Sequence, residues 1–422
     1  MVARLLAAAR RLPGVVGGRL SAIWAHPLLN LSVLLEASRE RLGGHSISPN
    51  HRPHLDEALA WLERAQDATA DDGFARGYSL CRHPYFHARG WQPSYPETTG
   101  YIIPTLYCAS RYLGRPDLGE RATRAARWEI AVQLPSGAVR GGVMGEPESP
   151  AVFNTGQVIL GWLSAFQETG EVAFADAAVR AGRFLTSTLE PDGHWRKGNS
   201  QFARGDATLY NARTAWALAE AGRRLQVPAF TAAAARHLRA VAALQAPNGW
   251  LPACCLSDPD RPLLHTLAYA IRGLLEGGRV LEDDRLIRHA ERAARALAAA
   301  VRSDGRMAGR FYPDWSPAAT WSCLTGQAQM ANNWMRLFHI NGDGTWLGPV
   351  PAVLAFLKST QNRTSPNLGL RGGIKGSAPG SGEYGRYEVL NWATKFFTDA
   401  LIRHECIVTG TASHVLADYP LA

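Results

Sequence analysis

One pattern recurs six times along the chain, and this repeat constrains the fold more than any other feature of the sequence. A glycine-containing turn returns at intervals of 64, 56, 56, 56 and 64 residues. Its six copies contain Gly73, Gly137, Gly193, Gly249, Gly305 and Gly369. A period of this length indicates one structural unit per copy, each stacked on its neighbours.

Each turn lies between two helical runs. The run before the turn has apolar residues at i, i+3, i+4 and i+7 with Arg and Glu between them, which predicts an amphipathic outer helix. These runs span 54–69, 119–134, 173–189, 229–245, 285–301 and 349–361. The run after the turn is apolar nearly all round, which predicts an inner helix; these runs span 98–113, 153–169, 207–224, 263–278, 320–340 and 385–404. We therefore predict an all-α fold, an (α/α)6 toroid of six helical hairpins, with any strands confined to short hairpins in loops.

The repeat covers residues 53–404, which we interpret as the toroid and catalytic domain, followed by a C-terminal tail over 405–422. Residues 1–52 break the pattern and form a basic N-terminal helical extension, with seven Arg against two Glu, or +5 of the net charge of +9. Residues 20–35 are largely apolar but too few for a spanning helix. Two interpretations stay open: a segment that contacts an anionic membrane through residues 1–45, or an extra helix packed against the domain. In both, the extension is peripheral to the toroid.

Composition excludes several classes of protein. With 46% hydrophobic and 19% charged residues, the chain is neither disordered nor a disulfide-rich miniprotein. The six Cys show no CxxC pair and no zinc spacing, so we expect reduced core thiols, no metal and no cofactor. A cytoplasmic location follows, with the inner membrane as the surface that the extension could touch. Only four of the 45 basic residues are Lys, which indicates a GC-rich genome as much as a basic surface, and no nucleic acid partner is expected.

The connections between helices are unequal in length. Those from inner to outer helices are short, as at 115–119, whereas those from outer to inner helices are long, as at 70–97 and 362–384. One face of the toroid thus carries nearly all the irregular chain, where binding and catalysis are usually built. The same face receives the N-termini of the six inner helices, whose free N–H groups favour anionic ligands.

Two carboxylates on this face are the first candidates for catalysis. Glu97 comes just before one inner helix and Asp206 just before another. Either could instead cap its helix. Three further carboxylates are the next candidates for catalysis: Glu148, Asp314 and Glu383. A carboxylate among helix N-termini is expected to stay ionised and to serve as base or nucleophile. The acid then belongs in a more apolar wall, and Asp314 beside Trp315 fits that role.

Aromatic and polar residues of the long loops are candidates for sugar binding, because sugar rings stack on Trp and Tyr while their hydroxyls need fixed polar partners. The set is Trp91, Tyr95, Asn154, Gln157, Trp195, Arg213, Trp250, Trp315, Gln327, Lys375 and Tyr384. Trp195 and Trp250 follow turn glycines in successive repeats, so they could equally be structural. We predict one shared pocket for the residues near inner-helix starts: Glu97, Tyr101, Asn154, Gln157, Asp206, Tyr210, Arg213, His265 and Gln327.

Two segments of the sequence resemble those of a known family. YPETTGYIIPTL (95–106) and GGIKGSAPGSGEYGRYEVLNWATKFF (372–397) are similar to a bacterial exopolysaccharide-biosynthesis family, the VpsJ-like group, and the resemblance runs from about residue 53 to 403. It implies a polysaccharide context without a defined reaction. The DGxW-type turns resemble those of squalene cyclase and prenyltransferase toroids, but the chain has no DxDD word and lacks the zinc set of the protein prenyltransferases.

Three functions fit these features. The first is hydrolysis of an oligo- or polysaccharide, in which Glu97 and Asp206 form the carboxylate pair. The second is lyase or C5-epimerase chemistry on a uronate, with Tyr101, Tyr210 or His265 as base and with Arg213, Asn154 or Gln157 neutralising the carboxylate. The third is a noncatalytic glycan-binding or export scaffold, which needs no acid pair. Helix ends and arginines favour an anionic glycan.

Overall fold

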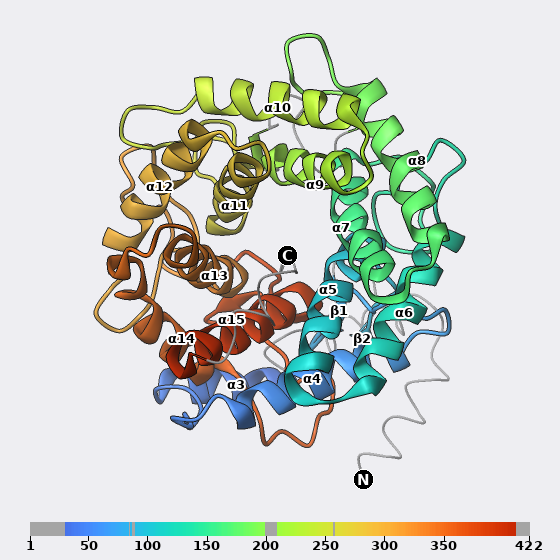
Figure 1. Ribbon diagram of the computed structural model, residues 1–422. Coiled ribbons are helices and arrows are strands. Elements are labelled where there is room, and N and C mark those ends of the chain that lie inside the picture. Colours follow the sequence, from blue (N-terminus) through green and yellow to red (C-terminus); the bar gives the residue numbers. More distant parts are fainter. Residues whose placement is uncertain (1–29, 84, 87–88, 199–208, 256–257, 411–422) are drawn as a thin grey trace, which may run out of the picture.

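The chain forms a closed ring of helices in two concentric layers (Figure 1). The computed structural model describes residues 30–410 apart from 84, 87–88, 199–208 and 256–257. The inner layer consists of α5 (Pro96–Leu113), α7 (Val152–Thr169), α9 (Ala212–Arg224), α11 (Leu264–Val280), α13 (Leu324–Asn341) and α15 (Asn391–Thr409). The outer layer consists of α4 (Arg52–Asp67), α6 (Pro116–Ala131), α8 (Val172–Thr188), α10 (Pro228–Ala243), α12 (Asp284–Ala299) and α14 (Val350–Thr360). The predicted (α/α)6 toroid and its twelve barrel helices are confirmed.

The Thr-Gly dipeptide at the start of inner helices has two structural roles. The Thr hydroxyl accepts the backbone N–H of the loop that precedes it: Phe74 N to Thr99 at 2.9 Å and Val139 N to Thr155 at 2.9 Å. The glycine allows neighbouring inner helices to touch, because a Cβ on Gly156 would lie 2.8 Å from the Cα of Thr214. This Thr-Gly dipeptide therefore fixes both the position of the preceding loop and the packing between neighbouring inner helices.

The turns between helices are fastened to the next outer helix. In four repeats a glutamine at or just beyond the end of an outer helix donates to a carbonyl of its own turn and to one of the following outer helix. The four are Gln66 (to Asp72 and Arg121), Gln133 (to Gly137 and Ala177), Gln245 (to Gly249 and His289) and Gln361 (to Gly372 and His54). The last of these links joins the sixth repeat to the first and closes the ring.

In two of the six turns, the left-handed position that packs on the next outer helix is not the glycine named from the sequence. Gly137, Gly193, Gly249 and Gly305 have φ between 78° and 87° and pack against the backbone of the next outer helix. In the sixth repeat this position belongs to Gly372 (φ 90°), whose missing side chain lets it approach the carbonyl of Glu57. In the first repeat the left-handed residue is Asp72 (φ 65°). The predicted Gly369 and Gly73 lie beside these positions.

Short strands occur in the long loops, as predicted, but they join different loops instead of forming local hairpins alone. β1 (Gly77–Ser79) pairs antiparallel with β2 (Gly90–Trp91) and also with β5 (Glu388–Leu390) from the last loop. β3 (Ser322–Cys323) pairs with β4 (Ser377–Ala378). These ladders tie the first, fifth and sixth loops together on one face. All six cysteines are free and buried, as expected for core thiols.

The described part of the N-terminal extension is anchored to the ring. Helix α3 (Leu31–Arg41) is followed by a segment in which the His45 N–H donates to the Ser359 carbonyl of α14 at 2.7 Å. Its Glu36 and Glu40 carboxylates pair with the Lys375 ammonium at 2.9 and 3.1 Å. Glu36 also accepts from Asn362. A buried ion pair therefore connects α3 to the sixth loop, as in the interpretation of an extra helix packed against the domain. The peripheral role of residues 1–52 stays a prediction.

Candidate active site

Glu97 lies in the first turn of α5, at the long-loop face of the ring. Its half-buried carboxylate accepts a hydrogen bond from the Tyr95 hydroxyl. The side chain of Tyr95 also interacts with Asn154 of α7. Among the described residues, no helix N–H donates a hydrogen bond to this carboxylate, so Glu97 is not a side-chain cap. Helix α5 positions Glu97, and the Phe74 carbonyl fixes the loop before it by accepting from Tyr95 N at 3.0 Å.

Burial raises the pKa of Glu97 to about 7, while the Tyr95 hydrogen bond and the charges of Arg76 and Arg213 offset part of that rise. This direction is opposite to the expectation that the carboxylate stays ionised among helix N-termini, because burial has the largest effect on its pKa. At neutral pH a large fraction of Glu97 carries its proton. Such a group suits general acid catalysis, and in its ionised form it can serve as a base.

Arg213 places a buried cation close to the centre of the ring. Its Nε donates to Gln157 Oε1 at 2.6 Å, and its guanidinium lies 5.0–6.0 Å from the rings of Tyr101, Trp216, Tyr269 and Phe396. Its Nη2 has no hydrogen-bond partner, and within the described residues no carboxylate pairs with it. A cavity of about 10 Å³, the room of about one water, borders Arg213, Arg272, Asn332 and Phe396.

A continuous series of ring contacts joins six of the aromatic residues on this face. Tyr210 touches Phe153, which touches Tyr269, with centroids 5.3 and 4.9 Å apart. His265 then bridges Tyr269 and Tyr384 at 4.4 and 5.2 Å. Tyr384 accepts from Trp392 Nε1 at 2.8 Å, and Trp392 lies against Tyr95. Residues of three inner helices (α7, α11 and α15) and of three connecting segments therefore meet around Glu97 and Arg213.

The structure brings together seven of the nine residues that were predicted to share a pocket: Glu97, Tyr101, Asn154, Gln157, Tyr210, Arg213 and His265. Asp206, the proposed partner of Glu97, lies outside the described residues. Gln327 is elsewhere, because its amide donates to the carbonyl of Gly305 at 2.9 Å and holds a turn. The predicted meeting of inner-helix starts is thus found for these seven residues.

The predicted bases are shifted away from neutral pH. Burial lowers the pKa of His265 to about 3, so its imidazole is neutral, and its Nδ1 lies 2.8 Å from Gln329 Oε1. Burial raises the pKa of Tyr101 and of Tyr210 above the ordinary tyrosine value. An efficient acid or base titrates near the working pH. Glu97 meets that condition, and these three residues do not.

The three carboxylates named as further catalytic candidates are all exposed to solvent. Asp314 is exposed, and its hydrogen bonds with Ser316 lower its pKa, so the expected rise beside Trp315 is wrong. Glu383 is exposed and pairs with Arg310 at 3.2 Å. Glu148 is exposed as well.

Several predicted sugar-binding residues have structural contacts instead. Trp195 is fully enclosed, donates to the Leu185 carbonyl at 2.9 Å and stacks on His237. Lys375 is buried in its ion pair with Glu36 and Glu40 and faces α3. Trp250 is buried against Trp315, with ring centroids 5.2 Å apart, and Trp91 packs on Trp61 at 5.1 Å. Burial excludes Trp195 and Lys375 from substrate contact in this conformation.

Sequence reasoning missed Glu388 and Arg76. Glu388 is buried on β5, and its carboxylate accepts from Arg76 at 2.9 Å and from Gln92. Arg76, His83 at 3.4 Å and the Gln92 hydrogen bond lower the pKa of Glu388 to about 2 despite its burial. Arg76 also covers the ring of Trp392 at 4.9 Å. The strand pairing of β1 with β5 brings these two residues together across 312 positions of sequence, and no local pattern indicates it.

Two other properties of the described chain bear on its class. Among the described residues, no three side chains of His, Cys, Asp or Glu are grouped so that they could hold a metal ion. Within the same part of the chain, none of the helices has the length and apolar character to cross a membrane.

The chain matches no protein-family model and no curated protein. It is similar in structure to solved carbohydrate-active enzymes. An unsaturated glucuronyl hydrolase specific for heparin superposes with a TM-score of 0.65 at 16% identity, over 84% of this chain and 97% of that one. A second unsaturated glucuronyl hydrolase, from a Bacillus species, gives 0.64 at 15% identity, over 85% and 97%. Cellobiose 2-epimerase from Bacillus thermoamylovorans gives 0.65 at 12% identity, over 83% and 98%. At these identities the likeness establishes the (α/α)6 toroid.

Proposed function

We propose that this chain is a carbohydrate-active enzyme that hydrolyses a glycosidic bond in an acidic bacterial saccharide, with Glu97 as the proton donor. The observation that carries the proposal is the carboxyl group of Glu97, which titrates near neutral pH on the face where the inner helices begin. Glu97 and Tyr95 are half-buried, so the polar cluster reaches solvent at these two residues.

The chemistry needs two proton transfers at Glu97, one from it and one to it. Protonated Glu97 gives its proton to the glycosidic oxygen as the bond from that oxygen to the anomeric carbon breaks. Water adds its hydroxyl to the anomeric carbon, and its remaining proton restores Glu97. The Tyr95 hydroxyl donates to the Glu97 carboxylate and stabilises it after the proton has left. The second carboxylate of a hydrolase is assigned to Asp206, on the sequence pattern alone.

Arg213 supports an acidic substrate. It is a buried guanidinium with an unpaired Nη2 and no carboxylate partner among the described residues, and it lies close enough to lower the pKa of Glu97. A carboxylated sugar would bring the negative charge that this cluster lacks. The adjoining cavity holds about one water, so saccharide binding requires the side chains of this face to move apart.

The similar structures support a saccharide substrate. One of these glucuronyl hydrolases is specific for heparin, and another is responsible for the degradation of glycosaminoglycan. A sugar epimerase from a ruminal bacterium also matches, with a TM-score of 0.65 at 14% identity. Epimerisation is therefore the second candidate function, in which ionised Glu97 would remove a proton from the sugar and Tyr101 or His265 would position the substrate.

The exopolysaccharide context and the cellular site belong to the same proposal. The words at 95–106 and 372–397 support a role beside polysaccharide synthesis in the cytoplasm. On α3 and directly after it, four leucines are 41–87% exposed: Leu31, Leu34, Leu35 and Leu42. The exposed Arg41 precedes the last of them. This exposed face supports peripheral contact with an anionic membrane. Co-flotation with anionic vesicles, lost in a Leu34→Ser/Leu35→Ser variant, is the expected result.

Incubation with paired neutral and uronic-acid oligosaccharides tests the proposed reaction. Hydrolysis of the acidic member produces new reducing ends without ultraviolet absorbance. A lyase would produce an unsaturated product that absorbs, and an epimerase would change the sugar without new reducing ends. No conversion of any acidic saccharide by the wild-type protein would contradict the proposal and favour the noncatalytic scaffold.

A further inference from the structure

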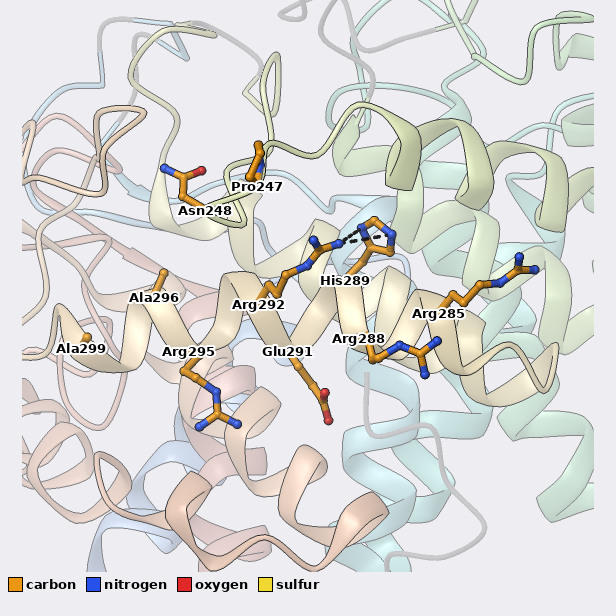
Figure 2. A pocket seen from close by; sticks show the side chains of 10 residues that line it. All are labelled: Pro247, Asn248, Arg285, Arg288, His289, Glu291, Arg292, Arg295, Ala296 and Ala299. Carbon is orange, nitrogen blue, oxygen red and sulfur yellow. Dashed lines mark hydrogen bonds between the residues drawn. The ribbon is translucent and has the colours of Figure 1, made fainter.

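A groove of about 820 Å³ lies on the outside of the ring against α12 (Figure 2). Its walls are side chains of α12 and the turn at Pro247 and Asn248, in the loop before α11. This volume falls in the range of ligand-binding sites. The groove shares none of its lining with the cluster around Glu97 and Arg213, so it is a second concave feature of the molecule.

Arginines dominate the groove. Arg285, Arg288, Arg292 and Arg295 leave α12 at helical spacing, all four are exposed, and they cover a stripe of about 15 Å. Arg285 pairs with Asp283 at 3.2 Å and Arg295 with Asp343 at 3.7 Å. No carboxylate pairs with Arg288 or Arg292 in the part of the chain that the structure describes, although Glu291 also borders the groove. The middle of the stripe therefore carries two uncompensated positive charges.

His289 adds no charge to this stripe. It lies between Arg288 and Arg292 on the same helix, and its Nδ1 is 2.8 Å from Arg292 Nη2 and 2.7 Å from Gln245 Oε1. Burial and then the two neighbouring arginines lower the pKa of His289. The His289 ring contacts the Arg292 guanidinium below the turn at Pro247 and Asn248, as Figure 2 shows.

We propose that this groove binds an acidic oligosaccharide chain at a site separate from the candidate active site. One arginine per helical turn gives a charge about every 5 Å. This spacing of positive charges suits a polymer with one carboxylate on each sugar, since guanidinium groups bind carboxylates through paired hydrogen bonds. Two uncompensated arginines fit such a ligand better than duplex nucleic acid, whose affinity depends on neutralising many phosphates. The choice of a saccharide rests on the proposed function.

The position of the groove relates it to the long-loop face. The turn at Pro247 and Asn248 belongs to that face, and the backbone of Gly249 packs on Arg292 of α12. The Asn248 carbonyl accepts from Trp315 Nε1 at 3.0 Å, so a half-buried indole stands at the same rim. A chain lying along α12 would thus reach the face on which Glu97 lies, and the groove would hold a polymer while one of its ends is processed.

Binding of a labelled alginate oligomer to the full-length protein tests this site. The double variant Arg288→Gln/Arg292→Gln is expected to bind the oligomer about tenfold more weakly than wild type at low salt. The matched control Arg180→Gln/Arg183→Gln removes two exposed arginines of α8 and is expected to bind as wild type does. Far-ultraviolet circular dichroism and thermal melting show that both variants are folded.

Three results would overturn the proposal: no alginate binding by wild type, equal binding by wild type and the groove variant, or equal binding of neutral dextran. Tighter binding of duplex DNA or of anionic vesicles through the same arginines would show that the ligand class is wrong. Hydrolysis of short acidic oligosaccharides is measured in parallel. Intact hydrolysis with no effect of the groove variant contradicts this site alone, whereas groove-dependent binding without hydrolysis contradicts the proposed reaction alone.

Discussion

At the scale of single residues, the half-buried Glu97 and the buried Glu388 differ in pKa because their partners differ. Glu388 has direct hydrogen bonds from Arg76 and Gln92, and its pKa falls to about 2. Glu97 has one hydroxyl partner, and its pKa rises to about 7. Environments that push two pKa values apart assign acid and base roles. Here they assign the proton to Glu97 and leave Glu388 to position Arg76.

Replacing Glu97 by Gln tests its chemical role. The variant keeps the shape of the side chain and loses its proton, so turnover is expected to fall by about 10²–10⁴-fold, with little change in melting temperature. The exposed Glu383→Gln is the matched control and should retain activity. Full activity with a lowered melting temperature in Glu97→Gln would show that Glu97 has a structural role only.

Glu129 of α6 gives a test of buried charge away from the site. Within the described part of the chain, both its oxygens lack hydrogen-bond partners, and burial raises its pKa well above the ordinary carboxyl value. The folded state therefore keeps a proton that the unfolded chain releases above pH ~4.5. Wild-type stability should fall relative to Glu129→Gln as pH rises from 5 toward 8, by up to about 1.4 kcal/mol per pH unit.

Urea denaturation at several pH values measures this difference. The control is Glu120→Gln, an exposed carboxylate on the same helix, which should give a difference from wild type that stays constant with pH. A Glu129→Gln difference that also stays constant would mean that the Glu129 carboxylate is ionised in the fold.

At the scale of elements, the turn after α12 depends on a glycine for two separate reasons. Gly305 has φ 78°, and a Cβ there would collide with the carbonyl oxygen of Ala352 on α14. Gly342 at the end of α13 has a similar φ of 73° but open space around it. Gly342→Ala is expected to cost about 1–2 kcal/mol, because alanine is strained in a left-handed backbone. Gly305→Ala should cost clearly more, by chemical denaturation. Equal losses would show that the turn can move away from α14.

Helix α3 is held to the sixth loop by the ion pair of Lys375 with Glu36 and Glu40. Lys375→Met leaves two carboxylates at this contact without their cation, and a loss of about 3–5 kcal/mol is expected. Lys197→Met, at an exposed lysine, is the control. The His45 hydrogen bond and Lys375 hold the pKa of Glu36 at about 2 against the effect of burial. The Lys375 contribution is thus present above pH ~4.5 and is lost as pH falls toward 2. Equal stability of the two variants in urea would contradict the anchoring of α3.

At the scale of the whole molecule, the sequence repeat was enough to predict the ring. Apolar periodicity and turn glycines are local signals, and they placed all twelve helices. The partners of Lys375 and Glu388 could not be predicted, because those contacts join residues 339 and 312 positions apart. The pKa of Glu97 was predicted with the wrong sign, since a helix N-terminus can be recognised in sequence and the loss of water around a side chain cannot.

The proposed reaction depends most on the protonation of Glu97 near neutral pH. Carbon NMR of protein with isotope-labelled glutamate carboxyl groups measures it directly and needs no substrate. The Glu97→Gln variant identifies the signal, which is expected to titrate with a pKa of about 7. Titration of that signal in the ordinary carboxyl range, near pH ~4.3, would contradict this expectation and remove Glu97 as the proton donor.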